Sequence, residues 1–148
     1  MTLALTTLSD LEEIRDLARR FCAGLDREDA DVLRSVFWPD ATDDHSWLFC
    51  GRAWDFVDMI LPQRARVRPT LHVVSNHTID VDAMGSRAAG EVYCVGFQFR
   101  HALAVPTTRV VVGRYLDEYE KREDEWRIIH RQYILEGTFV GAVPEARS

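Results

Sequence analysis

The sequence contains a single lysine, Lys121, against seventeen arginines. Lysine is the residue that forms Schiff bases with carbonyl substrates or anchors pyridoxal phosphate. Lys121 lies in the polar run 118–125, which is typical of a solvated hairpin turn. Lysine-based covalent catalysis is therefore close to excluded.

The sequence also lacks the short motifs of several enzyme and metal-binding classes. Its three cysteines, Cys22, Cys50 and Cys94, are widely spaced and form no CxxC pair, so neither a disulfide framework nor a zinc knuckle is expected. No GxGxxG, Walker A, GxSxG or HExxH motif occurs. Nucleotide binding and serine hydrolase chemistry are therefore without support, and no metal site is expected.

Long apolar runs and an excess of positive charge are absent as well. No run approaches the roughly 20 apolar residues that span a bilayer, and residues 1–9 lack the basic residues of a secretory signal. The formal net charge is −6 at pH 7, whereas nucleic-acid-binding domains are usually basic. These features predict a cytoplasmic protein that binds neither membranes nor nucleic acids.

What is present is typical of one globular domain covering residues 1–148. Hydrophobic residues make up 47% of the chain and charged residues 28%, which are ordinary values for a folded protein. In the first half, Ser9 and Glu12 have the spacing of a helix capping box, and apolar residues then recur at helical spacing. Pro62 is expected to end the last helix. The elements predicted here are a long helix from Ser9 to about Leu25, a short helix over 29–37, a strand over 45–50 and a helix over 53–61.

The second half, from Pro69 onward, is rich in β-branched and aromatic residues, which are typical of strands. Only short polar or Gly-containing breaks separate the segments, so we expect neighbouring strands to pair antiparallel. Helices followed by strands indicate an α+β fold, and a long curved sheet around helices would enclose a pocket. The predicted strands cover 71–81, 87–103, 107–120 and 125–138.

Asp26 is the first candidate for chemistry. It continues the four-residue row of Ala18 and Cys22 beside the apolar stripe of the first helix, so its side chain should point toward the core. Burial and the negative end of the helix dipole would both raise its pKa. The alternative, slightly favoured by the residues alone, is that Asp26 caps the second helix or closes the turn.

His72 and Asn76 form a second candidate group. They are four residues apart on a predicted strand, so both should face the same side. A histidine among apolar strand residues is more often a hydrogen-bonded core residue than a catalyst. His77 should face the opposite side, and could chelate a metal together with His72 only across a bulge.

Arg131 is the third candidate, on a predicted strand face that also carries Ile129, Tyr133 and Leu135. An arginine on an apolar face needs an anion, either a protein carboxylate or a substrate group, unless its stem reaches water at an edge. The stretch 40–45 contains acids and a histidine, but its spacing fits no standard metal geometry. We expect it to be a polar turn that enters a strand.

An ordered set of short segments runs through the chain: Ile14-Arg-Asp-Leu, Gly24-Leu-Asp26, Phe37-Trp-Pro-Asp-Ala41, Gly51, Thr70-Leu-His72 with Asn76, Gly113-Arg-Tyr-Leu-Asp-Glu-Tyr-Glu and Trp126-Arg-Ile-Ile-His-Arg131. Together these segments resemble the SnoaL-like branch of the nuclear transport factor 2-like superfamily. The resemblance covers about residues 8–140. Within the superfamily the chain is most similar to the group of hexachlorocyclohexane dehydrochlorinase, scytalone dehydratase and bile-acid dehydratase.

This resemblance implies a cone-shaped, strongly curved antiparallel sheet closed by three N-terminal helices. It also implies an Asp–His dyad that works without a metal or an organic cofactor, in which Asp26 and His72 form the dyad and Arg131 is a pocket arginine. Phe21 departs from the pattern, because such enzymes can carry a lysine or tyrosine there that assists the leaving group. Its replacement is expected among Tyr115, His101 and His45.

The expected function is that of a lyase. His72 would take a proton from a hydrophobic, ring-containing small molecule, Asp26 would orient the imidazole, and Arg131 with Asn76 would stabilise developing negative charge. Water, halide or a small carbonyl fragment would leave. An isomerase or polyketide cyclase with the same dyad, and a non-catalytic binding or assembly module, remain open because one fold hosts several functions.

The pocket and the outer surface give two further expectations. Apolar residues occur on both faces of the long strands, which predicts a homo-oligomer, a dimer or trimer. Aromatic and polar side chains around the dyad are expected to contact the substrate. The expected substrate-binding residues are Phe21, Trp38, Trp47, Phe49, Trp54, Asn76, Phe97, Phe99, His101 and Tyr115.

Overall fold

The computed structural model describes residues 5–64, 69–100 and 106–142. Within these ranges the chain has an α+β fold of three helices and one six-stranded sheet, which confirms the predicted class. None of the described helices is long and apolar enough to cross a membrane. The elements are α1 (Leu5–Arg27), α2 (Ala30–Ser35), β1 (Phe37–Asp44), β2 (Cys50–Arg52), α3 (Ala53–Arg64), β3 (Thr70–Val81), β4 (Arg87–Arg100), β5 (Thr107–Arg122) and β6 (Glu125–Ala142).

Helix α1 forms because one of its faces is apolar and can be buried against the sheet. Each fully buried large side chain contributes about 1.5–3 kcal/mol. The helix is already formed at Leu5, so the predicted start at a Ser9 capping box is wrong. The Ser9 hydroxyl instead donates to a Glu13 carboxylate oxygen one turn further on, at 3.5 Å. The buried residues of this face are Ile14, Leu17, Ala18, Phe21, Cys22 and Leu25.

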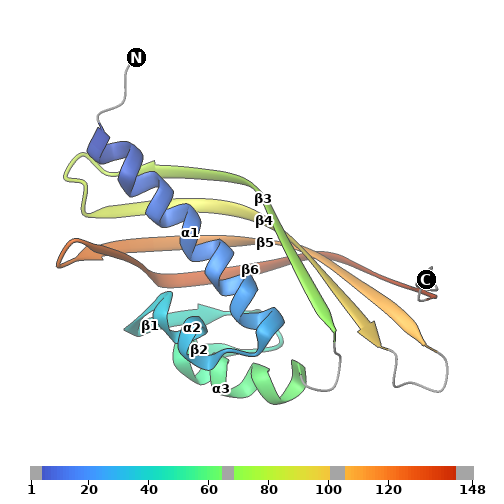
Figure 1. Ribbon diagram of the computed structural model, residues 1–148. Coiled ribbons are helices and arrows are strands. Elements are labelled where there is room, and N and C mark those ends of the chain that lie inside the picture. The colour runs from blue at the N-terminus through green and yellow to red at the C-terminus, as the bar shows by residue number, and fades with distance from the viewer. Residues whose placement is uncertain (1–4, 65–68, 101–105, 143–148) are drawn as a thin grey trace.

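The four long strands pair antiparallel in sequence order, as predicted. The sheet order is β2-β1-β6-β5-β4-β3. The sheet is mixed rather than purely antiparallel, because β1 runs parallel to β6. Figure 1 shows the long strands bending along their length, with α1 lying across them and α2 and α3 beside β1 and β2.

Strand β1 was not predicted from the sequence. Pro39 has no N–H to donate, but the pairing of β1 with β6 is irregular between Phe37 and Thr42, and this irregularity accommodates the proline. The predicted strand over 45–50 is instead a loop that precedes β2. In this loop the His45 N–H donates to the Phe49 carbonyl at 2.8 Å and turns the chain back. The polar stretch 40–45 therefore belongs mostly to a sheet strand.

The ends of the short helices also differ from expectation. Helix α2 ends at Ser35, before the predicted 37, and α3 continues to Arg64, two residues past Pro62. A proline affects the hydrogen bond of its own nitrogen and crowds one earlier carbonyl, so it does not by itself stop the following half-turn. The longer α3 brings Arg64 to the pocket described below.

Candidate active site

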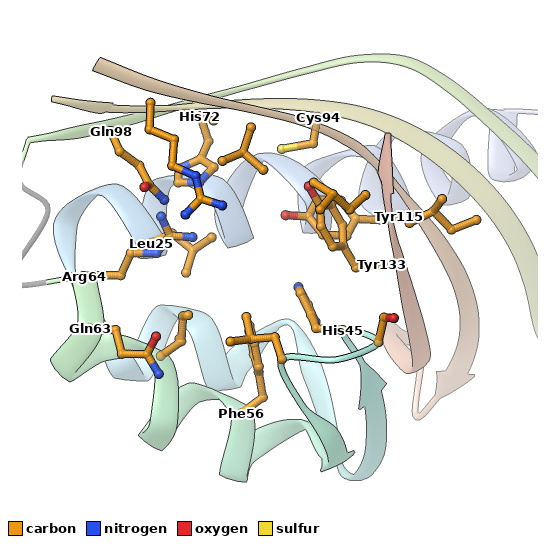
Figure 2. Close-up of a pocket in the computed structure, with 18 of the residues that line it drawn as sticks. Leu25, His45, Phe56, Gln63, Arg64, His72, Cys94, Gln98, Tyr115 and Tyr133 are labelled. Atoms are coloured by element: carbon orange, nitrogen blue, oxygen red, sulfur yellow. The ribbon is translucent and has the colours of Figure 1, made fainter. Parts of the chain in front are cut away.

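A pocket of about 580 Å³ lies between the inner face of the sheet and helix α3 (Figure 2). Helix α1, the loop 45–49 and four strands complete its walls. Among the described residues that line it there is no aspartate and no glutamate. The lining residues are Leu25, His45, Ser46, Trp47, Leu48, Phe56, Ile60, Gln63, Arg64, His72, Cys94, Gly96, Gln98, Arg100, Arg109, Val111, Tyr115, Gln132, Tyr133, Ile134 and Leu135.

Asp26 and His72 are in direct hydrogen-bond contact at one wall of this pocket. The last turn of α1 brings Asp26 to the beginning of β3. There the His72 Nδ1–H donates to Oδ1 at 2.5 Å and the His72 backbone N–H donates to Oδ2 at 2.9 Å. The Thr70 hydroxyl adds a third bond to Oδ1 at 3.1 Å. A ring that carries its proton on Nδ1 leaves Nε2 with a free lone pair.

The pKa of Asp26 is lowered, not raised as the sequence predicted. Burial does act to raise this pKa, but the hydrogen bonds from His72 and Thr70 outweigh burial and favour the carboxylate. The capping alternative does not apply either. The N-cap of α2 is Asp29, whose carboxylate accepts from the backbone N–H groups of Asp31 and Val32.

A second aspartate–histidine pair borders the same pocket. The Nδ1–H of His45 donates to Asp43 Oδ1, and both side chains are buried, at 8% and 0% exposure. The imidazole of His45 is stacked between two rings, with centroids 4.2 Å from Phe56 and 5.0 Å from Tyr133. Figure 2 shows His45 on the side of the pocket across from His72. The pocket therefore has two histidines, each oriented by its own carboxylate.

Arg131 does not line the pocket, so its predicted place as a substrate-contacting arginine is wrong. Its side chain is 0% exposed and forms a two-point salt bridge with Asp117, its direct cross-strand neighbour, with both N–O distances 2.7 Å. The guanidinium carbon lies 4.3 Å from the Phe21 ring centroid and 4.1 Å from that of Tyr115. The anion that pairs with Arg131 is therefore a protein carboxylate, one of the two possibilities that the sequence left open.

A bulge in β3 reverses the predicted orientations of Asn76 and His77. The pairing of β3 with β4 shifts between Ser75 and Thr78, and Asn76 takes a positive φ of 46°. Asn76 is therefore exposed, and it does not line the pocket. His77 is turned inward, where its Nε2 lies 3.1 Å from the Tyr119 hydroxyl and burial lowers its pKa.

Two of the predicted aromatic substrate contacts, Trp47 and Tyr115, line the pocket. Phe21 is instead a core residue, 1% exposed. Phe97 and Phe99 stack on each other at 6.3 Å. They lie on the opposite face of β4 from Gly96 and Gln98, because side chains alternate along a strand. His101 lies outside the described residues.

The remaining predicted aromatic residues are used in packing. The indole N–H of Trp38 donates to the Glu120 carbonyl at 2.9 Å, and its ring is flanked by the guanidinium groups of Arg122 and Arg127. The indole N–H of Trp54 donates to the Arg34 carbonyl. Phe49 packs against Phe56 and does not line the pocket. These three residues are thus not substrate contacts.

Sequence reasoning missed several pocket residues. The Asp43–His45 pair had a detectable signal, since residues two apart on a strand face the same side, but the segment was interpreted as a turn. Arg64 and Arg100 gave no signal, because nothing local distinguishes a pocket arginine from a surface one. Within the described ranges, no three His, Cys, Asp or Glu side chains gather closely enough to hold a metal ion.

The sequence from residue 6 to residue 132 matches the SnoaL-like domain. The chain therefore belongs to the SnoaL-like family of the nuclear transport factor 2-like superfamily, as the resemblance implied. A comparison with curated proteins gave no match.

Several solved structures share the fold of this chain. The chain is 16% identical to hexachlorocyclohexane dehydrochlorinase LinA-type3 from Novosphingobium barchaimii, with a TM-score of 0.83 over 97% of this chain and 98% of the other. It is 21% identical to a candidate scytalone dehydratase from Novosphingobium aromaticivorans, with a TM-score of 0.80 over 97% of each chain. The protein Kfla4162 from Kribbella flavida is 20% identical, with a TM-score of 0.80 over 90% of this chain and 95% of the other. At these identities the comparison establishes the shared fold.

Proposed function

We propose that the protein is a cofactor-independent lyase acting on a hydrophobic, ring-containing small molecule. The observation that carries this proposal is the hydrogen bond from His72 Nδ1 to Asp26, made at the wall of an open pocket of about 580 Å³. In this tautomer Nε2 accepts a proton from a substrate C–H bond, and the ionised Asp26 stabilises the resulting imidazolium. Membership of the SnoaL-like family supports the assignment.

The second pair, Asp43 and His45, is suited to assist the leaving group. As His72 takes the proton, the C–H electrons form a double bond and the bond to the leaving group breaks. When that group is a hydroxyl, the His45 imidazolium donates a proton and water departs, and solvent then restores both histidines. Asp43, by its contact with Nδ1, fixes the orientation of the His45 ring.

His45 is a better proton donor than the two tyrosines that line the pocket, Tyr115 and Tyr133. Burial raises the pKa of the Tyr115 phenol well above its ordinary value and that of Tyr133 to about 12, so both phenols are weak acids. His45 carries an imidazole, the group that most often transfers protons in enzymes.

Two histidines on different walls also favour one alternative, an isomerase. A proton taken by His72 could be returned to another carbon by His45, and the product would then have the mass of the substrate. A non-catalytic binding module needs neither histidine to be oriented by a carboxylate. The presence of two such pairs beside an open cavity therefore favours catalysis.

The test compares two dyad variants with a matched histidine control. Ring-containing hydrophobic compounds that raise the melting temperature are incubated with the protein in D₂O, and mass spectrometry follows elimination and C–H exchange.

His72→Gln should lower the rates of elimination and exchange by about 10²–10⁴-fold. Asp26→Asn should also lower both rates strongly, because its amide favours the wrong tautomer of His72. His130→Gln, whose Nδ1 contacts Thr42 away from the pocket, should retain the rates. The dyad assignment fails if both dyad variants fold, as judged by melting curves, and keep near-wild-type turnover.

A further inference from the structure

Three arginines line the pocket that holds His72: Arg64, Arg100 and Arg109. The chain as a whole carries a net charge of −6, yet no described lining residue is an aspartate or glutamate. The pocket wall therefore presents three guanidinium groups, whereas the neighbouring carboxylates of Asp26 and Asp43 do not line the pocket and are each hydrogen-bonded to a histidine. Such a concentration of one sign in a low-dielectric cleft attracts a ligand of the opposite sign.

Two of these arginines have buried nitrogen atoms without a hydrogen-bond partner among the described residues. They are Nε and Nη1 of Arg64 and Nε of Arg100. Burial lowers the pKa of the Arg64 guanidinium, although the charge of Asp26 acts to raise it, and Arg64 forms no salt bridge with a described carboxylate. The buried Arg131, by contrast, forms a two-point salt bridge with Asp117 through Nε and Nη2, and only its Nη1 lacks a partner. Buried charged donors are costly unless they are paired, so the nitrogens of Arg64 and Arg100 are suited to an anion supplied from outside.

The arginines approach one end of the pocket from two sides. Gln98 and Arg109 are direct cross-strand neighbours on β4 and β5, and Arg100 follows on the same face of β4. Arg64 is the last residue of α3 and comes from the facing wall. Figure 2 shows Arg64 and Gln98 gathered at the end of the pocket away from His45.

We propose that Arg64, Arg100 and Arg109, together with Gln98, bind a carboxylate of the substrate. This inference rests on the proposed function and narrows its substrate class to ring-containing hydrophobic acids. Planar guanidinium forks match carboxylate oxygens in pairs. The nearby end of α3 is the negative end of its dipole, which opposes a doubly charged phosphate more strongly than a singly charged carboxylate.

The placement also fits the chemistry of proton removal. A carboxylate on the reacting carbon would oppose the second negative charge that develops when its C–H bond breaks. The arginine end is also the end that holds His72, whose cross-strand partner Gly96 is two residues from Gln98, so the guanidinium groups that hold the carboxylate also offset this opposition. Apolar side chains, including Leu25, Phe56 and Ile60, line the pocket and can contact the ring. The carboxylate thus serves for recognition and orientation.

The test measures binding of matched acid and amide pairs by isothermal titration calorimetry. The probes are 2-naphthoate with 2-naphthamide, and biphenyl-4-carboxylate with its amide. Wild-type protein should bind at least one acid about tenfold or more tightly than its amide. Arg64→Gln and Arg100→Gln should each remove most of that preference while changing amide affinity little. Arg87→Gln is the matched control, because its side chain is 75% exposed and lies outside the pocket.

The absence of any acid preference in wild-type protein, in both probe pairs, overturns the proposal, and this comparison requires no variant to fold. The proposal is also overturned if the Arg64→Gln protein folds and prefers the acid over its amide as strongly as the Arg87→Gln control does. Binding is also separable from catalysis. His72→Gln should keep the preference for the acid, so a failure of the lyase mechanism alone would leave the acid preference intact.

Discussion

The imidazole of His72 lies directly against the backbone of Gly96, its partner across the β3–β4 ladder. A Cβ atom at position 96 would lie 3.0 Å from both Cδ2 and Nε2 of the ring. The hydrogen bond from Nδ1 to Asp26 holds the ring on one side, and the bare backbone of Gly96 leaves room for it on the other. Glycine at this position therefore permits the ring orientation that the proposed chemistry needs.

Replacing Gly96 by alanine should displace the His72 ring. Because misplacing a reacting group by about 1 Å can cost about 10²-fold in rate, we expect turnover to fall by about that factor while the protein still folds. Gly137→Ala is the control, since a Cβ there meets nothing within 4 Å. Turnover rates and melting curves of the two variants test this prediction. Equal turnover rates in the two folded variants would contradict it.

His45→Gln should have an effect that depends on the leaving group. Loss of a hydroxyl needs a proton donor, whereas a halide leaves as a stable anion. We therefore expect the variant to lower the rate of dehydration by about 10²-fold or more and to change halide elimination less. Parallel rate measurements on a hydroxyl and a halide substrate of the same ring skeleton test this. Equal losses for both would mean that His45 does not donate the proton.

Asp26 should make part of the stability pH-dependent. Burial acts to raise its pKa, but the hydrogen bonds from His72 and Thr70 hold the pKa below the ordinary 3.8. A carboxylate with a lowered folded-state pKa contributes stability above its unfolded-state pKa, and this contribution is lost as pH falls through the folded-state value. The destabilisation caused by Asp26→Asn should thus be larger at pH 7 than at pH 3. Urea denaturation at both pH values measures it, with the exposed Asp124→Asn as control.

Arg131→Met should destabilise the protein by about 3–5 kcal/mol, because it leaves the buried Asp117 carboxylate without its partner. Replacing both residues, as Asp117→Leu with Arg131→Met, should recover much of that loss, since the buried charge is then removed as well. Urea denaturation of the single and double variants gives the two values. If the single variant is as stable as wild type, the salt bridge does not have this structural role.

The outer face of β3 and β4 should be covered in a homo-oligomer, a dimer or trimer. Leu71, Val73 and Tyr93 are 51%, 48% and 42% exposed on these two paired strands, and adjacent exposed apolar side chains favour association. Val73→Glu should therefore shift the protein to a monomer in light scattering at micromolar concentration. Met84→Glu, in the turn between the two strands, should not. A monomeric wild-type protein would contradict the prediction.

The long antiparallel strands and the buried face of α1 could be predicted from the sequence because their patterns are local. Apolar residues at helical spacing identify the face of α1. The pairing of Asp26 with His72, 46 residues apart, followed only from the family resemblance. Nothing in either segment alone requires that contact.

Strand β1 and the orientation of Asn76 could not be predicted in the same way. Phe37 to Asp44 contains a proline and four polar residues, and it is a strand because β6 supplies a parallel partner. Asn76 faces outward because the β3–β4 ladder has a bulge there. Strand preference depends on neighbouring strands, and one extra residue in a ladder reverses every later side chain.

By itself, the sequence determined the α+β class, the order of most of its elements and the residue types available for acid–base chemistry. The tertiary structure alone decided which of them share a pocket. It pairs Arg131 with Asp117, which removes that arginine from the pocket, and it brings Arg64 and Arg100 to the pocket without a carboxylate. The physical reason is that the surroundings of a charged side chain depend on which distant segments pack against it, and no local pattern contains that information.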